Sequence, residues 1–285
     1  MWNQITLDVP DDLKDAVIGE LSEDGVAGVW EHTAELPGAT RLVAYFDAPV
    51  DVDGLTGRIH AIFSRANRSA PAVCRSRVEE CDWTEEWRKS YSSFSVGDNF
   101  FVIPSWVDSP CPDDRLAIRI DPGQAFGTGT HETTQLTMEA LERWVEPHSV
   151  VLDVGTGSGI LAIASRLLGA RQVIACDIDP IAVQVAKANI LRNNGHELWT
   201  FCGSVDAVRD GCVHLLLGNL TADVIMEILP QFVRILAPKG IAVLSGILNE
   251  QREDVLVRCG ESGLVIHEEV VRGEWLALIC EKYGA

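Results

Sequence analysis

Residues 151–159 have the sequence VLDVGTGSG, in which apolar residues surround one acid and three glycines alternate with small polar residues. The apolar residues predict a buried strand over residues 149–154, and residues 159–168 continue as an apolar helix. Glycines at such a junction let a ligand approach the backbone closely and leave the first amides of the helix open to it. The stretch therefore predicts a ligand-binding loop between a strand and the helix that follows it.

The spacing of the glycines distinguishes between two classes of ligand. The dinucleotide fingerprint G-x-G-x-x-G, begun at Gly155, would need its third glycine at Ile160, so that pattern fails. The sequence D-x-G-x-G-x-G instead resembles the first motif of class I methyltransferases, which use S-adenosylmethionine. This cofactor has no pyrophosphate, and its charged amino-acid end and sulfonium suit an acid beside the loop. We therefore expect the cofactor to contact Asp153, Gly155, Gly157 and Gly159.

A second acid follows the next predicted strand, at residues 172–176. Asp177 lies 22 residues after Gly155, close to the distance of roughly 20 residues at which an acid binds ribose hydroxyls in folds of this kind. We therefore expect Asp177 to accept hydrogen bonds from the ribose. Asp179, which precedes Pro180, is expected to cap the next helix. A nicotinamide-dependent dehydrogenase remains the alternative interpretation of the same loop and acid.

Strands and helices alternate from residue 149 onward. Strands are predicted at 149–154, 172–176, 198–202, 213–217, 241–244, 264–271 and 275–281, and helices at 159–168, 181–192 and 222–236. A turn is expected at 237–240, and the last two strands are expected to form a hairpin around 272–274. This alternation favours an α/β fold with a doubly wound, mostly parallel sheet, which binds ligands at the carboxyl ends of its strands.

The first 81 residues have a different order of elements. Strands are predicted at 2–9, 26–30, 41–46 and 72–78, and helices at 11–21 and 55–63. The order β-α-β-β-α-β is that of a small ferredoxin-like α+β domain. We therefore divide the chain into an N-terminal domain (1–81), a linker (82–106) and the larger α/β domain (107–285).

The linker is rich in aromatic residues. Trp83, Trp87 and Tyr91 recur every four residues, which places their rings on one stripe of a helix. We interpret this helix as a strut between the domains whose rings are buried. An exposed aromatic face that docks a partner is the alternative.

The composition restricts the possible partners. Asp and Glu number 42 against 23 Lys and Arg, a net charge of −19 that disfavours nucleic acid and favours a basic protein partner. No uncharged run reaches the roughly 20 residues of a membrane helix, and the first residues lack the pattern of a secretory signal. The eight cysteines include no C-x-x-C pair, so no metal site is predicted. We expect a cytoplasmic protein that binds no membrane.

A long loop precedes the predicted cofactor fold. Residues 121–134, DPGQAFGTGTHETT, combine three glycines with four threonines. We interpret this loop as a lid or wall over the cofactor, with a threonine capping a helix that begins near Glu132. His131 is expected to position the loop, and a role as a general base is the alternative.

Taken together, these motifs resemble one family of methyltransferases. DPGQAFGTGTHETT, VLDVGTGSGILAIASRLLGA, DIDPIAV and GNL are similar to segments of the ribosomal protein L-eleven lysine methyltransferases. DWTEEWRKSYSSFSVGDNFFVIPSW, SGIL and EWLALICEK extend the similarity over residues 82–282. The resemblance implies an N-terminal domain that recognises the ribosomal protein and a C-terminal domain that methylates lysine side chains and the terminal amine. It also implies cofactor contacts at Thr134, Gly155, Asp177 and Asn219.

Asn219 is the candidate catalytic residue, at the tip of the fourth predicted strand in the sequence Gly218-Asn219-Leu220. Amine-methylating enzymes carry an Asn or Asp here, whose oxygen can accept a hydrogen from the attacking amine and aim its lone pair at the methyl group. The absence of N-P-P-[FY] argues against adenine or glutamine as the acceptor. Two alternatives remain, a lysine of another protein as the substrate and an adenosine-binding protein without activity. The intact Asp177 and Asn219 argue against the latter.

Overall fold

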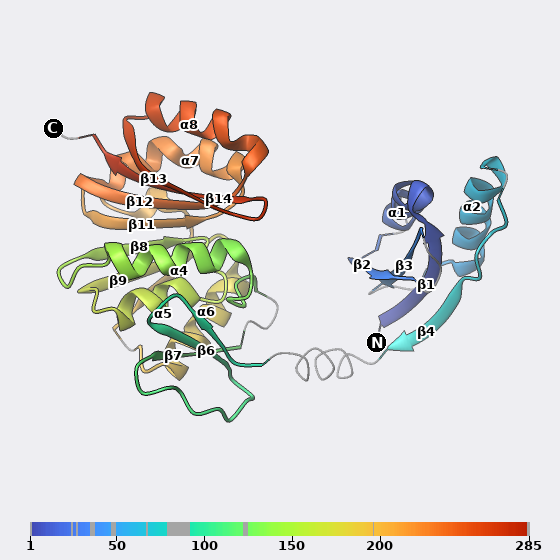
Figure 1. Cartoon of the computed structure of the whole chain (residues 1–285), viewed down its shortest axis with the longest axis horizontal. Coiled ribbons are helices and arrows are strands. Elements are labelled where there is room, and N and C mark those ends of the chain that lie inside the picture. Colours follow the sequence, from blue (N-terminus) through green and yellow to red (C-terminus); the bar gives the residue numbers. More distant parts are fainter. Residues whose placement is uncertain are drawn as a thin grey trace. The chain divides into compact units, whose positions relative to one another are not determined.

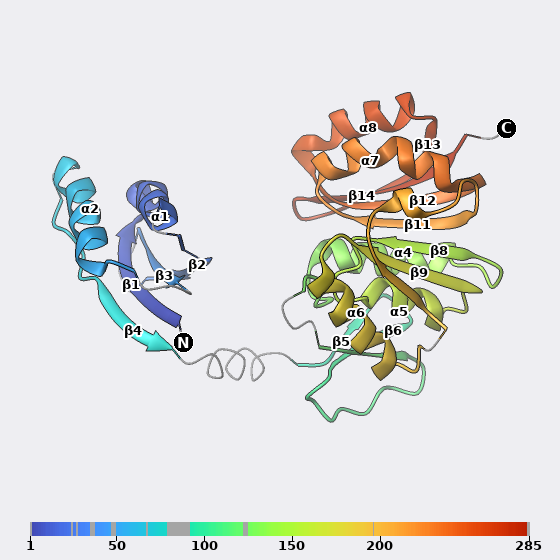
Figure 2. The ribbon, with the colours of Figure 1, turned by 180° about the vertical axis from the view of Figure 1, so that it is seen from behind.

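The computed structural model describes residues 2–23, 25–26, 28–34, 38–46, 50–66, 68–78, 92–121, 125–195 and 197–283. The chain divides into two compact units, Met1–Tyr91 and Ser92–Ala285 (Figures 1 and 2). Within the part of the chain that the structure describes, no helix is both long enough and apolar enough to span a membrane. The predicted aromatic stripe of Trp83, Trp87 and Tyr91 lies outside the described residues.

Among its described residues, the first unit has a four-stranded antiparallel sheet and two α-helices. Its elements are β1 (Trp2–Pro10), the 3-10 turn η1 (Asp11–Leu13), α1 (Lys14–Glu23), β2 (Gly28–Thr33), β3 (Ala39–Phe46), α2 (Val52–Arg65) and β4 (Cys74–Val78). The strand order β2-β3-β1-β4 is that of a ferredoxin-like sheet. The small α+β domain expected from the sequence is confirmed.

Both helices of the first unit pack on the same face of its sheet. Ile5, Leu7 and Val9 alternate along β1 and are buried, because every second side chain of a strand points to the same face. Their cluster also contains Val17 and Leu21 of α1, and Leu55, Ile59 and Phe63 of α2. Burying apolar side chains of this size contributes roughly 1.5–3 kcal/mol each, so this face holds the small domain together.

The second unit is built on a seven-stranded sheet with the order β10-β9-β8-β11-β12-β14-β13. Its strands are β8 (Val150–Val154), β9 (Gln172–Asp177), β10 (Trp199–Cys202), β11 (Val213–Asn219), β12 (Leu236–Leu248), β13 (Leu264–Arg272) and β14 (Trp275–Lys282). The strands from β10 to β12 in this order pair in parallel, and β14 pairs antiparallel with both β12 and β13. The predicted doubly wound sheet with a C-terminal hairpin is therefore confirmed.

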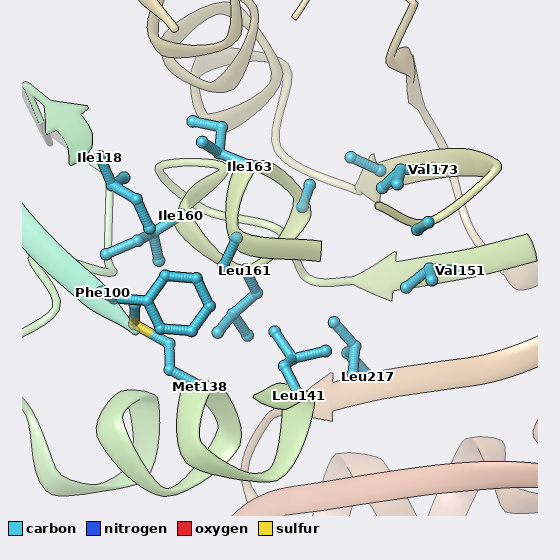
Figure 3. Close-up of a cluster of buried hydrophobic side chains, with 14 of the residues drawn as sticks. Phe100, Ile118, Met138, Leu141, Val151, Ile160, Leu161, Ile163, Val173 and Leu217 are labelled. Carbon is cyan, nitrogen blue, oxygen red and sulfur yellow. The ribbon is translucent and has the colours of Figure 1, made fainter. Parts of the chain in front are cut away.

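Helices cover both faces of this sheet (Figures 1 and 2). They are α4 (Glu132–Trp144), α5 (Ile160–Leu167), α6 (Pro180–Arg192), α7 (Ala222–Ile235) and α8 (Arg252–Glu261), with 3-10 turns η2 (Val205–Ala207) and η3 (Asn249–Gln251). Val151 packs with residues of α4, α5 and α6 (Figure 3), whereas the next residue, Leu152, packs with residues of α7 and α8. Burial on both faces explains a strand that is apolar except for Asp153.

A small second sheet and α8 are not predicted by the sequence pattern. The sheet consists of β5 (Phe94–Val96), β6 (Phe100–Pro104) and β7 (Leu116–Ile120), and it belongs to the second unit. Phe100 and Ile118 pack in one cluster with Met138 of α4 (Figure 3). Strands of three to five residues carry little periodicity, and α8 buries only Val255 and Cys259. Tertiary packing, rather than local pattern, therefore stabilises these elements.

Residues 237–240, where the sequence predicts a turn, lie within the bounds of β12, but neither β11 nor β14 supplies a pairing partner for them. They form a bulge, in which the pairing of β12 with β11 shifts register between Val213 and Leu215. Lys239 lies in the bulge with a φ of 60°. The residues have the composition of a turn and bend the strand locally, and the regular pairing of β12 with β11 and β14 resumes at Ile241.

Candidate functional site

The carboxyl ends of three neighbouring strands meet where the strand order of the large sheet reverses. β8 lies between β9 and β11 and pairs in parallel with both. The segments at these ends carry Gly155, Asp177 and Asn219, which lie far apart in the sequence. Parallel sheets bind ligands at such a switch point, because the chain leaves neighbouring strands toward opposite faces of the sheet.

A pocket of about 780 Å³ opens at this edge of the sheet. Four of the seven residues expected to contact the cofactor line it, namely Gly155, Gly157, Asp177 and Asn219. The other three do not line it, namely Thr134, Asp153 and Gly159. A volume in this range suits a small organic cofactor.

The glycine loop brings backbone directly to the wall of this pocket. Gly155 and Gly157 have φ values of 69° and 51°, in the left-handed region that favours glycine. A Cβ at Gly155 would clash with the side chain of Leu220, and one at Gly157 would clash with the carbonyl oxygen of Phe126. Glycine is therefore required at both positions, because a side chain would collide with a neighbouring residue and because the backbone adopts a left-handed conformation.

Gly157→Ala is expected to weaken cofactor binding by at least about tenfold, which corresponds to about 1.4 kcal/mol, because the added methyl group displaces the loop from Phe126. Gly169→Ala is the matched control, since Gly169 also has a positive φ but nothing within 4 Å of its Cβ position. Both variants carry the left-handed penalty of about 1–2 kcal/mol, so they differ in the clash and in its place at the pocket wall. Calorimetric titration measures both affinities, and equal values would contradict this interpretation of the loop.

Asp153 lies beneath the loop with no exposed surface. Its Oδ2 accepts a hydrogen bond of 2.6 Å from the Thr156 hydroxyl, whereas its Oδ1 has no hydrogen-bond partner in the described residues. Burial raises the pKa of Asp153 to about 7, and the hydrogen bond from Thr156 opposes part of this rise. Because Asp153 does not line the pocket, its carboxyl group supports the glycine loop through Thr156 from beneath.

Asp177 connects the strand end to the glycine loop. Its Oδ2 accepts a hydrogen bond of 3.0 Å from the backbone N–H of Gly157, and its Oδ1 accepts one of 3.0 Å from the N–H of Asp179. A carboxylate has about four acceptor positions, so both oxygens keep a lone pair for ligand hydroxyls. Asp179 accepts a hydrogen bond of 2.8 Å from the N–H of Ile181, and its predicted role as the cap of α6 is confirmed.

A hydrogen bond to Thr134 orients the side chain of Asn219, although the two residues are distant in the sequence. The Asn219 Nδ2 donates a hydrogen bond of 3.3 Å to the Thr134 hydroxyl, which is buried in the first turn of α4. With its amino group used in this way, the side chain directs its carbonyl oxygen away from Thr134. Asn219 lines the pocket, so an acceptor is available to a group bound there.

His131, rather than a threonine, caps α4. Its Nδ1 accepts a hydrogen bond of 3.3 Å from the backbone N–H of Thr133 and lies 2.8 Å from the Thr133 hydroxyl. The imidazole ring packs edge-on against Phe126, with 5.7 Å between ring centroids, and against Trp275, at 5.0 Å. These contacts favour the interpretation that His131 positions the loop over its role as a base.

Sequence reasoning missed several residues that line the pocket. They include Ile178, Val205, Val224, Glu227, Ile228 and Trp275. Ile178 directly follows Asp177 and is 79% exposed, so the position after the acid was an available signal. Val224 and Ile228 are four residues apart in α7 and share a helical face. Trp275 comes from the C-terminal hairpin, and no local pattern indicates its place in the pocket.

The pocket lining is acidic. Asp177, Asp179 and Glu227 contribute carboxylates, and no lysine or arginine belongs to the lining in the described part of the chain. This charge favours a cationic ligand and disfavours a pyrophosphate. No group of three or more His, Cys, Asp or Glu residues suitable for a metal ion is found among the described residues.

The family model "Ribosomal protein L11 methyltransferase (PrmA)" matches residues 1–283. The chain belongs to this family. It is 35% identical over 274 residues to the ribosomal protein L11 methyltransferase of Heliobacterium modesticaldum, covering 90% of this chain and 85% of that protein. It is 35% identical over 296 residues to the corresponding protein of Synechococcus elongatus, covering 98% of this chain and 96% of that protein.

A solved structure of the same family is also similar. The ribosomal protein L11 methylase of Lactobacillus delbrueckii subsp. bulgaricus superposes with a TM-score of 0.64 at 34% identity, over 67% of this chain and 99% of that chain. The predicted family, methyltransferase activity and use of S-adenosylmethionine are confirmed. The acidic lining and the glycine backbone at the pocket wall both fit this cationic cofactor.

Proposed function

We propose that this chain transfers methyl groups from S-adenosylmethionine to amines of ribosomal protein L11, chiefly those of lysine side chains. The observation that carries the proposal is the position of Asn219, which lines the same pocket as Asp177 and Gly157 in a chain of this family. The relatives from Heliobacterium and Synechococcus are named for L11, and we extend that substrate to this chain. Because L11 is a ribosomal protein, we place the reaction in the cytoplasm.

The pocket offers separate groups to the two ends of the cofactor. The remaining lone pairs of Asp177 suit the ribose hydroxyls, and the backbone of the glycine loop, beneath which Asp153 is buried, suits the charged amino-acid end. When bound, S-adenosylmethionine supplies an electrophilic methyl group and a positive charge that disfavours a protonated amine beside it. Thr134 acts through Asn219, and Gly159 lets α5 approach Ala186 of α6 closely.

The acceptor amine must lose its proton before it can attack. For a lysine with the ordinary pKa of about 10.4, presenting the neutral amine at pH 7 costs about 4–5 kcal/mol. Asn219 reduces this barrier by accepting a hydrogen bond from the amine, which leaves the nitrogen lone pair directed at the methyl group. Holding the two groups in line also raises their effective concentration. We therefore assign no separate general base.

The first unit is proposed to recognise the ribosomal protein. One face of its sheet packs on the helices, and the other carries Trp30, which is 46% exposed and pairs across the strands with Val43. Exposed tryptophans are frequent anchors in protein interfaces. The net charge of −19 additionally favours a basic substrate such as a ribosomal protein.

Removal of Met1–Tyr91 is expected to leave cofactor affinity unchanged, because every residue that lines the pocket lies in the second unit. The kcat/KM for intact L11 should fall by at least about tenfold, the equivalent of about 1.4 kcal/mol of lost docking energy. A short peptide that contains the target lysine should be methylated equally well by both proteins. In the full chain, Trp30→Ala should raise the KM for L11 without changing kcat. Full activity of the truncated protein on intact L11 would argue against a recognition domain.

The proposed activity itself is tested with purified L11 and isotope-labelled S-adenosylmethionine. Mass spectrometry of proteolytic fragments should show whole methyl increments on lysine-containing peptides of L11. A parallel incubation with cell extract identifies other acceptors. Labelled methyl groups on a different protein, with none on L11, would establish the alternative substrate. The absence of label on any protein would contradict the proposed function.

A further inference from the structure

Two asparagines of α6 bind the end of β7 as a neighbouring strand would. The Asn189 Oδ1 accepts a hydrogen bond of 3.0 Å from the backbone N–H of Asp121, and its Nδ2 donates one of 2.9 Å to the Asp121 carbonyl oxygen. Asn193 forms the same pair of hydrogen bonds with Arg119, at 2.8 Å and 2.7 Å. Four residues of a helix rise about 6 Å and two residues of a strand about 6.6 Å. The two amide groups therefore match alternate residues of this segment.

Asn189 also binds the glycine loop. Its side chain is completely buried, and its Nδ2 donates a second hydrogen bond, of 2.9 Å, to the carbonyl oxygen of Ser158. Its Oδ1 accepts a further hydrogen bond of 3.1 Å from Arg192, so both donors and both lone pairs of the amide are used. Asn193 instead donates its other hydrogen bond, of 2.8 Å, to the backbone carbonyl of Asn189. Asn189 thus joins the end of β7 to the glycine loop.

Ser158 connects Asn189 to the wall of the pocket. Its backbone N–H donates a hydrogen bond of 2.8 Å to the carbonyl oxygen of Phe126, and its hydroxyl donates one of 2.5 Å to that of Gly127. Phe126 lines the pocket, and Gly157 of the pocket wall lies against the same carbonyl group of Phe126. Through Ser158, Asn189 is therefore connected to two segments that line the pocket.

Gly159 explains how α6 comes close enough for this contact. Gly159 does not line the pocket, and a Cβ at this position would lie 3.2 Å from both Cα and Cβ of Ala186. Ala186 and Asn189 are three residues apart and share a face of α6. A side chain at residue 159 would push α6 away and lengthen the hydrogen bond from Asn189 to Ser158. The third glycine of the motif therefore allows Asn189 to reach the glycine loop.

We propose that Asn189 is a positioning residue of the cofactor site, which holds the glycine loop and Phe126 in the arrangement that binds S-adenosylmethionine. The inference rests on the proposed placement of the cofactor in this pocket. Asn189 does not line the pocket, so it acts through Ser158 and Asp121. A cofactor that binds this arrangement stabilises the hydrogen bonds of Asn189, and by linkage these hydrogen bonds stabilise the bound cofactor. The hydrogen bonds between Asn193 and Arg119 have no such coupling.

Asn189→Ala and Asn193→Ala are the matched variants, because each removes an amide that binds the same segment from the same helix. Both should lower the melting temperature. At a temperature at which circular dichroism shows both to be folded, calorimetric titration of the full chain with S-adenosylmethionine measures their affinities. Asn189→Ala should bind at least about fivefold more weakly than wild type, the loss expected for about one hydrogen bond. Asn193→Ala should stay within about twofold of wild type.

The rate of methyl transfer to L11 separates positioning of the cofactor site from a part in the reaction itself. Single-turnover rates at saturating S-adenosylmethionine should lie within about twofold of wild type in both variants, because Asn189 contacts no reacting group. At subsaturating cofactor, the rate of Asn189→Ala should fall in proportion to its weaker affinity, and that of Asn193→Ala should not.

Hydrogen exchange of two backbone amides in the wild-type protein keeps the inference testable if Asn189→Ala does not fold. The N–H of Asp121 is held by Asn189, and the N–H of Arg119 is held by Asn193. S-adenosylmethionine at about a hundred times its Kd should slow exchange at Asp121 at least about tenfold. Exchange at Arg119 should slow by less than about twofold. Nuclear magnetic resonance measures both amides in one sample.

The outcomes separate this inference from the proposed function. Equal cofactor affinities of the two folded variants would overturn it, because Asn189 would then contribute to stability alone. Equal slowing of exchange at Asp121 and Arg119 would also overturn it, as would a rate in Asn189→Ala that stays low at saturating cofactor. Wild-type protein that binds no S-adenosylmethionine would overturn the proposed cofactor site and, with it, this inference.

Discussion

Asp177→Ala should weaken S-adenosylmethionine binding by about 30- to 900-fold, or about 2–4 kcal/mol. The substitution removes the acceptor proposed for two ribose hydroxyls. It also frees the backbone N–H of Gly157, which Asp177 now holds at 3.0 Å, so the glycine loop loses one of its anchors. Calorimetric titration of the folded variant, with circular dichroism to verify the fold, measures the loss.

Asp179→Ala is the matched control for this experiment. Asp179 also lines the pocket and carries the same charge, but its Oδ1 caps α6 through Ile181. Its loss should cost about 1 kcal/mol of stability with little change in cofactor affinity. Unchanged affinity in Asp177→Ala would refute the assignment of the ribose site, and tight binding of NADH by the wild-type protein would refute the choice of cofactor.

Asn219→Ala should lower the rate of methyl transfer by about 30- to 150-fold, the loss expected for one oriented hydrogen bond of about 2–3 kcal/mol to the attacking nitrogen. Single-turnover measurements at saturating S-adenosylmethionine separate this loss from any change in cofactor affinity. If Asn219 only shapes the cofactor site, saturation should restore the rate. A rate within about twofold of wild type at saturation would show that Asn219 is structural.

Thr134→Val provides the control for orientation. The valine keeps the shape of the buried side chain but removes the oxygen that accepts the 3.3 Å hydrogen bond from the Asn219 Nδ2. The Asn219 side chain stays in the pocket but loses the hydrogen bond that orients it. The rate of methyl transfer should therefore fall by less than in Asn219→Ala. A loss in Thr134→Val that equals the loss in Asn219→Ala would assign the whole effect of Asn219 to its orientation.

Local sequence patterns were sufficient to predict the main elements of both units. The alternation of Ile5, Leu7 and Val9 reflects a strand with one buried face, and the apolar run around Val151 reflects a strand buried on both faces. The glycine loop and Asp177 are equally local, because each depends on a turn or a strand end within a few residues. The structure brings these local signals together at one pocket.

Local sequence patterns did not predict elements that are stabilised by packing against residues distant in the sequence. The strands β5, β6 and β7 are too short for periodicity and form a sheet that packs on α4 and α5. The bulge at 237–240 has the composition of a turn and no partner in β11 or β14, and only the pairing on both sides of it reveals that β12 extends across it. The cap of α4 is His131, whose ring is held by Phe126 and by Trp275 from the C-terminal hairpin.

The sequence by itself determined the class of fold, the ligand loop and the residues at its strand ends, because these depend on burial and turn geometry within single segments. Only the tertiary structure decided which of these ends are neighbours. The order β9-β8-β11 brings Asp177 and Asn219 to one pocket, and α4 supplies Thr134 to orient Asn219 from 85 residues away. Burial likewise raises the pKa of Asp153 to about 7, since a side chain has no low-dielectric surroundings until the strands and helices around it have packed.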